Sequence, residues 1–189
     1  MSTLKVNEIQ NTSGGSTITN VGKVIQVIQV VKTDTLSVSS VGTGSFTNTD
    51  STFNISITPS SSSNLILLGG FVNVAVSGGD QGVKMIIRRD GSNLTTAVNG
   101  SGTAAAVGDL DGSRTRATSG GAIANHGQHS IPISIIDKPS TTNAVTYSLG
   151  LGHASSVSRT MYINLVNADN NASQWSRFCS VFIAQEISA

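Results

Sequence analysis

The stretch KVIQVIQVVK, residues Lys23 to Lys32, decides the predicted fold because its pattern fits a β-strand with two apolar faces. Successive side chains of a strand point to opposite faces, so a strand with one solvated face alternates apolar and polar residues. Here the two glutamines are three residues apart, and each falls on a different face among valines and isoleucines. One face holds Val24, Gln26, Ile28 and Val30, and the other holds Ile25, Val27, Gln29 and Val31. One face can pack on the core of the chain itself, so the other requires a second surface that covers it.

The composition predicts one all-β domain with a neutral surface. The chain has 189 residues, enough for a sizeable core. Only 11% of its residues are charged and the net charge is +1, which excludes the clustered basic surface of a nucleic-acid-binding protein. The start, MSTLKVNEIQ, lacks the apolar segment of a signal peptide, and no apolar run reaches membrane-spanning length. The single Cys179 excludes an internal disulfide, and its apolar surroundings, FCSVFIA, predict a small buried side chain.

Short β-branched runs, separated by clusters of Gly, Asn, Asp and Ser, indicate a sandwich or barrel, since helical periodicity is almost absent. The sequence predicts eight strands, which cover residues 23–32, 53–58, 64–76, 83–89, 130–136, 144–151, 159–166 and 177–187.

These strands fall into two sets according to the number of their apolar faces. The second, fourth, fifth and seventh alternate apolar and polar residues, so only one face of each is apolar. The first, third and eighth are apolar in both registers, and the sixth, VTYSLGL, places bulky residues opposite small ones. The partition predicts an eight-stranded jelly roll over residues 23–189, with one sheet facing water and the other facing partner subunits.

Self-association follows from the cost of leaving an apolar sheet face in water. An exposed Val, Leu or Ile forgoes about 1.5–3 kcal/mol, and monomers rarely expose large apolar patches. Two alternatives stay open: β-bulges could change the assumed registers, or loops could cover the second face. The candidate subunit-interface residues are Val24, Ile25, Val27, Ile28, Val30, Val31, Val72, Val74, Phe178, Val181 and Phe182.

Motifs that would indicate an enzyme, a metal or a cofactor are weak. The sequence has no phosphate-binding glycine loop followed by Lys and no nucleophile elbow. His126 and His129, in NHGQH, face opposite ways on an extended chain, which favours ordinary loop histidines over metal ligands. Asp109 and Asp111, in GDLDGSR, lack the further acidic ligands of a calcium loop. We therefore expect no catalytic residues, no metal and no cofactor, with a glycan-cleaving enzyme as a distant alternative because carboxylate pairs form only in space.

The segment 93–129 is predicted to be a long loop insertion rich in small residues. Loops of this length in compact domains are usually functional or mobile, and at one end of a jelly roll this loop could meet a receptor such as a surface glycan or protein. The alternative is a mobile or partner-ordered loop without a binding role. The receptor-loop candidates are Asp109, Asp111, Arg114, Arg116, His126 and His129.

Several stretches carry a resemblance to a known class of protein. The opening MSTLKVNEIQNTSGG resembles the start of small bacteriophage virion proteins of the tail-fibre and tail-structural type. The stretches GKVIQVIQVVKTDTLS, FNISITPSSSSNLILLGGFVNVAV and SRFCSVFIAQEISA resemble C-terminal domains of such proteins, especially from marine and cyanobacterial phages. The resemblance implies a homotrimeric jelly roll like those of C1q and tumour necrosis factor. It also implies a non-enzymatic virion appendage of the tail-fibre or knob type that contributes to tail structure and host-surface attachment. The alternative is a capsid-surface decoration protein that clamps shell subunits.

The N-terminal segment, residues 1–22, is predicted to be an anchoring arm. It is too short and polar to fold alone, and its apolar residues are Leu4, Val6, Ile9 and Ile18. We expect it to add strands to a neighbouring subunit or to another virion protein. The alternative is an N-terminal hairpin packed on its own domain.

Overall fold

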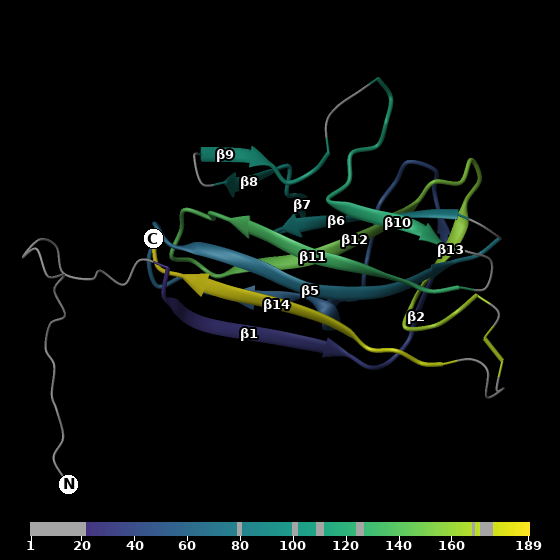
Figure 1. Cartoon of the computed structure of the whole chain (residues 1–189), viewed down its shortest axis with the longest axis horizontal. Helices are drawn as coiled ribbons and strands as arrows, with labels where there is room; N and C mark the ends of the chain where they lie inside the picture. Colours follow the sequence, from purple (N-terminus) through teal and green to yellow (C-terminus); the bar gives the residue numbers. More distant parts are fainter. Residues whose placement is uncertain are drawn as a thin grey trace, which may run out of the picture.

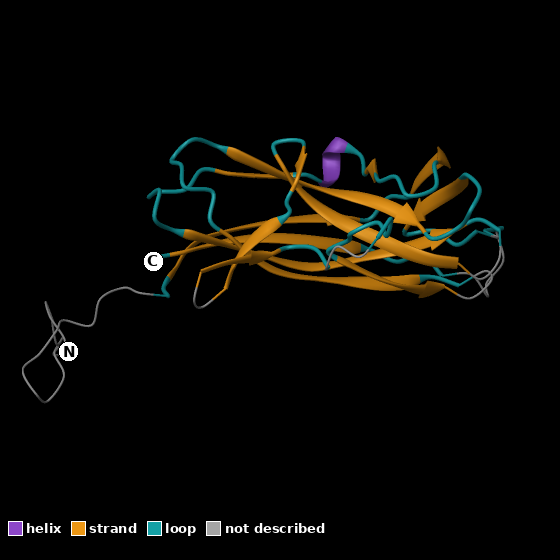
Figure 2. Cartoon of the chain, turned by 90° about the horizontal axis from the view of Figure 1, so that it is seen from above, coloured by secondary structure: helices purple, strands orange, loops and turns teal. Residues whose placement is uncertain are grey.

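Two antiparallel β-sheets pack face to face in the computed structural model (Figure 2), as the sequence predicts. The structure describes residues 22–78, 81–99, 102–108, 112–123, 127–167, 169–170 and 176–189. Within these ranges the only helix is the short 3-10 turn η1 (Ser51–Phe53), and no helix could cross a lipid bilayer. The all-β sandwich is therefore confirmed.

The first sheet contains the strand whose two faces are apolar. Its four long strands lie side by side (Figure 1), in the order β1 (Val24–Lys32), β14 (Ser180–Ile187), β5 (Leu65–Val76) and β11 (His129–Asp137). The far end of β5 also pairs with β13 (Arg159–Ile163), which in turn pairs with β2 (Leu36–Val41). Because Gly22 N–H donates to the Ser188 carbonyl, the described chain begins and ends at the same end of the sandwich.

The second sheet is built around β6 and β12. Its strands, from one edge to the other, are β10 (Ser119–Ile123), β6 (Gln81–Arg89), β12 (Val145–His153) and, both beside β12, β3 (Thr47–Asn48) and β4 (Ile55–Ile57). The short β7 (Ser92–Asn93) pairs with β6, and β8 (Thr96–Asn99) with β9 (Gly102–Ala105) forms a separate hairpin.

The eight principal strands follow the jelly-roll order. In chain order they are β1, β4, β5, β6, β10, β11, β12 and β14; the first, eighth, third and sixth form one sheet, and the second, seventh, fourth and fifth form the other. Three of the predicted strands nevertheless lie in the wrong sheet: those at 130–136 and 159–166 belong to the first sheet, and the one at 144–151 belongs to the second. The error arises because β10, with the sequence SGGAI, lacks apolar alternation and was missed.

Apolar side chains from both sheets form one continuous core. The largest fully buried side chains include Phe53, Phe182 and Tyr147, and the rings of Phe53 and Phe182 lie with their centroids 6.2 Å apart. Tilted ring pairs at this distance add to the energy of burial. The core therefore joins η1, beside the second sheet, to β14 of the first.

Candidate interaction surface

The outward face of the first sheet is an apolar feature of the described surface. Alternation along its four long strands leaves apolar residues on the side away from the core. We call this set the apolar face: Val24, Ile25, Val27, Val31, Leu65, Leu67, Phe71, Pro132, Ile136, Val181, Ile183 and Ile187. The four members on β1 are 44–55% exposed. The strand β1 thus has one face in the core and one in solvent.

Cross-strand register makes these residues neighbours. Val31 lies opposite Val181, which lies opposite Phe71 on the next strand, and Phe71 lies opposite Pro132. Directly opposed side chains on one face of a sheet are close enough to touch. The apolar face is therefore continuous across β1, β14, β5 and β11.

A β-bulge adds apolar area at the start of β1. Val24 pairs with Ile187 and Gln26 with Glu186, so Ile25 is an extra residue on β1. A bulge sets two residues against one on the partner strand, which lets Val24 and Ile25 both lie on the exposed side. Simple alternation had assigned Val24 to the same face as Gln26, and the bulge overturns that assignment.

The inward position of Gln26 depends on the carboxylate of Glu186, which has no exposed surface. The Gln26 amide nitrogen lies 2.6 Å from this carboxylate, the Asn64 amide nitrogen 2.6 Å, and the Ser60 backbone nitrogen and hydroxyl 2.7 and 2.8 Å. Burial disfavours the charged form, but the hydrogen bonds from Asn64, Gln26 and Ser60 outweigh it and lower the pKa of Glu186 to about 2. This network fixes the register of β1 against β14 at the bulged end.

A buried lysine holds the other end of β1. The Lys32 ammonium lies 2.5 Å from the Asp50 carboxylate and 3.0 Å from that of Asp34. Burial opposes the charge of Lys32, but hydrogen bonds with Asp50 and Asp34 raise its pKa, and the same pairing lowers the pKa of Asp50. Polar partners thus hold β1 from the core side at both ends, and its outward apolar side chains offer no such polar groups.

The predicted interface residues divide between the two faces. Six lie exposed or half-buried on the outside: Val24, Ile25, Val27, Val31, Val181 and Phe178, the last just before β14. The predictions for Val72, Val74 and Phe182 are corrected, because these three have no exposed surface and belong to the core. Ile28 and Val30 also point inward and pack against the core. The even-numbered residues of β5 and β14 face the core. A strand that is apolar in both registers does not show in its sequence which of its two faces is buried.

The prediction of a buried Cys179 is also wrong. Cys179 is exposed, and so is its neighbour Phe178. The strand β14 begins only at Ser180, so the apolar run FCSVFIA does not lie in the sheet over its whole length.

The small residues of β12 face the chain itself. On the face of the second sheet that points away from the core, a Cβ at Gly152 would lie 2.5 Å from the Ser45 carbonyl oxygen. A Cβ at Gly150 would lie 3.2 Å from the Phe46 Cβ. Ile86, predicted to share a solvated face, is only 3% exposed. The partition predicts a partner subunit on this side of β12, and the structure places the segment around Phe46 there instead.

The predicted loop insertion 93–129 contains regular structure. It includes most of β7 to β10, and β10 is an integral strand of the second sheet. His129 is the first residue of β11, and its ring packs against Gly121 of β10, where a Cβ would lie 2.0 Å from Nε2. The predicted candidates Asp109, Asp111, His126, Leu4, Val6, Ile9 and Ile18 lie outside the described residues.

Arg114 and Arg116 line one pocket on the outside of the second sheet. The pocket measures about 360 Å³, and its other lining residues include Phe46, Ile86 and Val107. Two of the predicted receptor-loop residues are therefore brought together. Sequence reasoning missed the apolar part of the pocket, because Phe46 belongs to a segment that was not assigned to any element.

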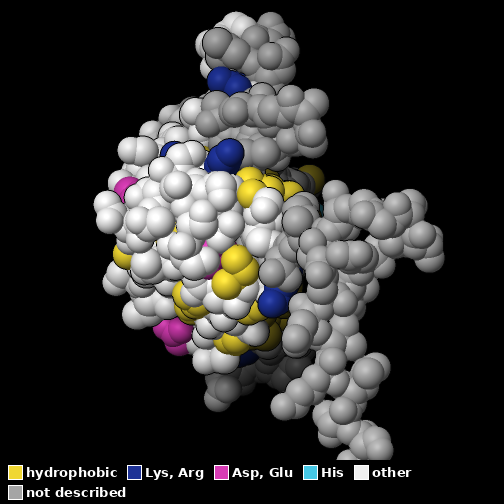
Figure 3. Space-filling model, turned by 90° about the vertical axis from the view of Figure 1, so that its left-hand side faces the viewer, with side chains coloured by type: hydrophobic (Ala, Val, Ile, Leu, Met, Phe, Trp, Pro, Cys, Tyr) yellow, Lys and Arg dark blue, Asp and Glu magenta, His cyan; other side chains and the backbone are white. Residues whose placement is uncertain are grey.

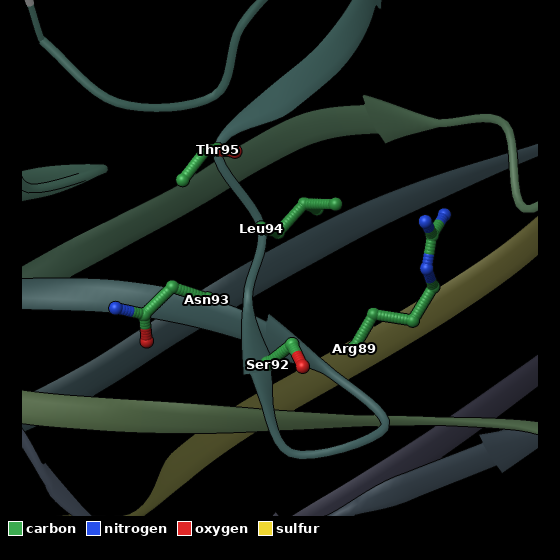
Figure 4. Close-up of a pocket in the computed structure, with 5 residues that line it drawn as sticks. All are labelled: Arg89, Ser92, Asn93, Leu94 and Thr95. Carbon is green, nitrogen blue, oxygen red and sulfur yellow. The ribbon is translucent and has the colours of Figure 1, made fainter.

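A second hollow of about 120 Å³ lies beside the β6–β7 turn (Figure 4). Arg89 and Asn93 extend from it in opposite directions. The Arg89 guanidinium lies 2.7 Å from the carboxylate of Asp137, which also accepts a 2.6 Å hydrogen bond from the Tyr147 hydroxyl. Burial, followed by the bond to Asp137, raises the pKa of Tyr147. Arg89, Asp137 and Tyr147 therefore satisfy one another.

Histidine and acidic side chains do not gather into a metal site within the part of the chain that the structure describes. The buried ring of His153 accepts a hydrogen bond from Ser155 N–H at Nδ1, so its Nε2 donates to the Val41 carbonyl at 2.7 Å. His153 therefore joins β12 to β2. The end of the molecule nearest the C-terminus shows only scattered charged side chains (Figure 3), as the low charge content leads us to expect.

Comparisons with known proteins give a distant likeness. No protein-family model and no curated protein sequence matches the chain. Among solved structures, that of infectious bursal disease virus Gx strain is 12% identical over 97% of this chain and 42% of that one, with a TM-score of 0.45. The VP2 subviral particle of the same virus is 12% identical over the same shares, with a TM-score of 0.37. The chain spans less than half the length of these proteins, and a likeness this weak assigns neither a family nor a function.

Proposed function

We propose that this protein is a non-enzymatic structural component of a virus particle that assembles with copies of itself through the apolar face. The single observation that carries the proposal is that β1, held from the core side at both ends, still exposes Val24, Ile25, Val27 and Val31 by 44–55%. Burying the exposed half of each such side chain contributes about 1 kcal/mol, so a full interface stabilises an assembly by several kcal/mol per subunit.

The assembly we propose is a homotrimeric bacteriophage appendage of the tail-fibre or knob type, exposed on the particle and contributing to host attachment. The sequence resemblance supports this, together with the jelly-roll strand order and the position of the apolar face on one sheet. Its partners are other copies of the chain, other virion proteins and a host surface glycan or protein. Labelling of particles with an antibody tests the location: label at the tail supports an appendage, and label over the head supports a decoration protein instead.

Solution mass is the direct test of self-association. Light scattering across a range of protein concentrations should give three times 19.4 kDa. A stable mass of one chain at every concentration would show that the apolar face does not bind another copy.

The N-terminal segment is the proposed attachment point to the particle. Deletion of residues 1–20 should leave a trimer of normal stability, because the described core begins after this segment. The deleted protein should then fail to incorporate into particles. Trimers that still incorporate would refute the anchoring role and leave the assembly role intact.

A further inference from the structure

The pocket on the outside of the second sheet combines an apolar floor with a cationic rim. Ile86 and Val107 lie at its base, only 3% and 6% exposed, and Phe46 forms part of its wall. Arg114 and Arg116 complete the lining, together with the polar residues Asn93, Thr95 and Thr115. A volume of about 360 Å³ falls within the usual range for small-molecule sites.

Several polar groups of this site are held in place by the chain itself. Arg116 Nε donates to the Gly108 carbonyl at 2.7 Å. Nearby, Arg88 donates to the Asn93 side chain at 2.9 Å and to the Phe46 carbonyl at 3.2 Å. Asn93 and Phe46 are thereby positioned before any ligand arrives, which lowers the entropy cost of binding.

The electrostatic environment favours an anion. No described carboxylate lines the pocket, whereas Arg116 does, and Arg88 and Lys84 lie on the same outward side of β6. Burial lowers the pKa of both Arg88 and Lys84, so positive charge on this side is incompletely solvated. A guanidinium pairs in a planar, two-bond geometry with carboxylates, and an aromatic ring offers a flat apolar surface.

We propose that this pocket binds a carboxylate-bearing saccharide. Arg116 pairs with the carboxylate, Phe46 and Ile86 contact the apolar face of the sugar ring, and Asn93, Thr95 and Thr115 bind ring hydroxyls. The inference specifies a ligand for the attachment role. It rests on the proposed function, because that function names a host surface as the source of the saccharide. The pocket lies on the sheet opposite the apolar face, so self-association leaves it open.

Binding of glucuronic acid and of glucose, which differ in one carboxylate, tests the proposal by calorimetry or NMR titration on the full chain. Glucuronic acid should bind saturably and at least about tenfold more tightly than glucose, because one charge-assisted pair is worth about that much. Inorganic phosphate should bind more weakly than glucuronic acid, since it cannot contact the apolar floor. Equal binding of both sugars, phosphate binding as tight as that of glucuronic acid, or no saturable binding would each overturn the proposal.

Variants locate the site. Arg116→Gln should weaken glucuronic acid binding about tenfold, and Phe46→Ala should weaken binding of either sugar. Lys138→Gln removes the same charge from an exposed residue outside the pocket and should leave binding unchanged. Thermal unfolding identifies any variant that fails to fold. Equal losses from Arg116→Gln and Lys138→Gln would show that only net charge matters, which would also overturn the proposal.

Self-association and sugar binding are measured separately, so that either can fail alone. A trimer that binds neither sugar refutes the pocket alone. A monomer that binds glucuronic acid refutes the proposed assembly and keeps the pocket.

Discussion

At the scale of single residues, the buried carboxylate of Glu186 determines which side of β1 faces the core. Its hydrogen bonds with Gln26 and Asn64, both at 2.6 Å, give a buried polar partner to Gln26, which the sequence pattern placed among apolar residues. Gln26 could be assigned to a face from its spacing, but the pairing with a residue 160 positions away could not, because it exists only after the sheet has formed.

Replacement of Glu186 by Gln should destabilise the protein at neutral pH by about 1–3 kcal/mol. The reason is that the hydrogen-bond donors around this position would lose the charged carboxylate to which they donate. The folded pKa of Glu186, about 2, lies below its ordinary value of 4.5, so its contribution to stability is present above pH 4.5 and is lost as pH falls towards 2. Urea unfolding followed by circular dichroism should therefore show a flatter pH dependence for Glu186→Gln in this window. Some slope should remain, since the pKa of Asp50 is lowered as well.

The exposed Asp34 provides the control for this experiment. Its side chain is 70% exposed, so Asp34→Asn should keep most of the acid-induced loss seen in the wild type. If Glu186→Gln titrates like the wild type, the network does not hold a charged carboxylate.

At the scale of elements, the two faces of β1 can be separated by matched substitutions. Val27 is 55% exposed on the apolar face, and Val30 packs against the core from the same strand. Val27→Asp should abolish self-association in light scattering while the unfolding free energy of the monomer changes by less than about 0.5 kcal/mol. Val30→Asp should cost about 2–4 kcal/mol because it moves a charge against the core. The reverse pattern would mean that β1 lies in the opposite register.

The covering of β12 by the segment around Phe46 gives a second prediction at this scale. A Cβ on Gly152 would lie 2.5 Å from the Ser45 carbonyl oxygen, so Gly152→Ala should force the covering segment away at a cost of about 1–3 kcal/mol. Gly42→Ala is the matched control, because a Cβ there meets the side chain of Ser45 no closer than 3.4 Å. Thermal unfolding of the two variants measures the difference, and equal midpoints would contradict the close packing.

The strands also show which parts of the fold can be predicted from a sequence pattern. Strands with a long apolar run, such as β5, or with strong apolar alternation, such as β6 and β11, lie within one or two residues of their predicted bounds. The strand β10 was missed because Gly120 and Gly121 carry no side-chain signal, although a Cβ on Gly120 would lie 2.5 Å from the Val83 carbonyl oxygen. Its close approach to β6 selects glycine there, and that requirement is visible only in the folded sheet.

At the scale of the whole molecule, the jelly-roll order is established by strand pairing, because the number of apolar faces placed three predicted strands in the wrong sheet. The prediction that successive strands divide between two sheets holds once β10 is counted and β13 is treated as an addition to the first sheet. Of the candidate site, the spacing separated the residues of β1 into two faces but did not show which face is outward, and the bulge changed the face of Val24. The pocket could not be predicted, because it brings together Phe46 and Arg116 from segments 70 residues apart.

The thermal stability of the whole molecule should depend on its concentration if the apolar face binds other copies. Association stabilises the folded state by mass action, so the unfolding midpoint of a trimer rises with protein concentration. Calorimetric scans over a hundredfold range of concentration should show an upward shift of several degrees for the wild type. The same scans of Val27→Asp should give a constant midpoint, since the substitution puts a charge on a residue whose side chain is exposed in the single chain. A midpoint that does not change for either protein would mean that the apolar face stays open to solvent, and the assembly role would then fail.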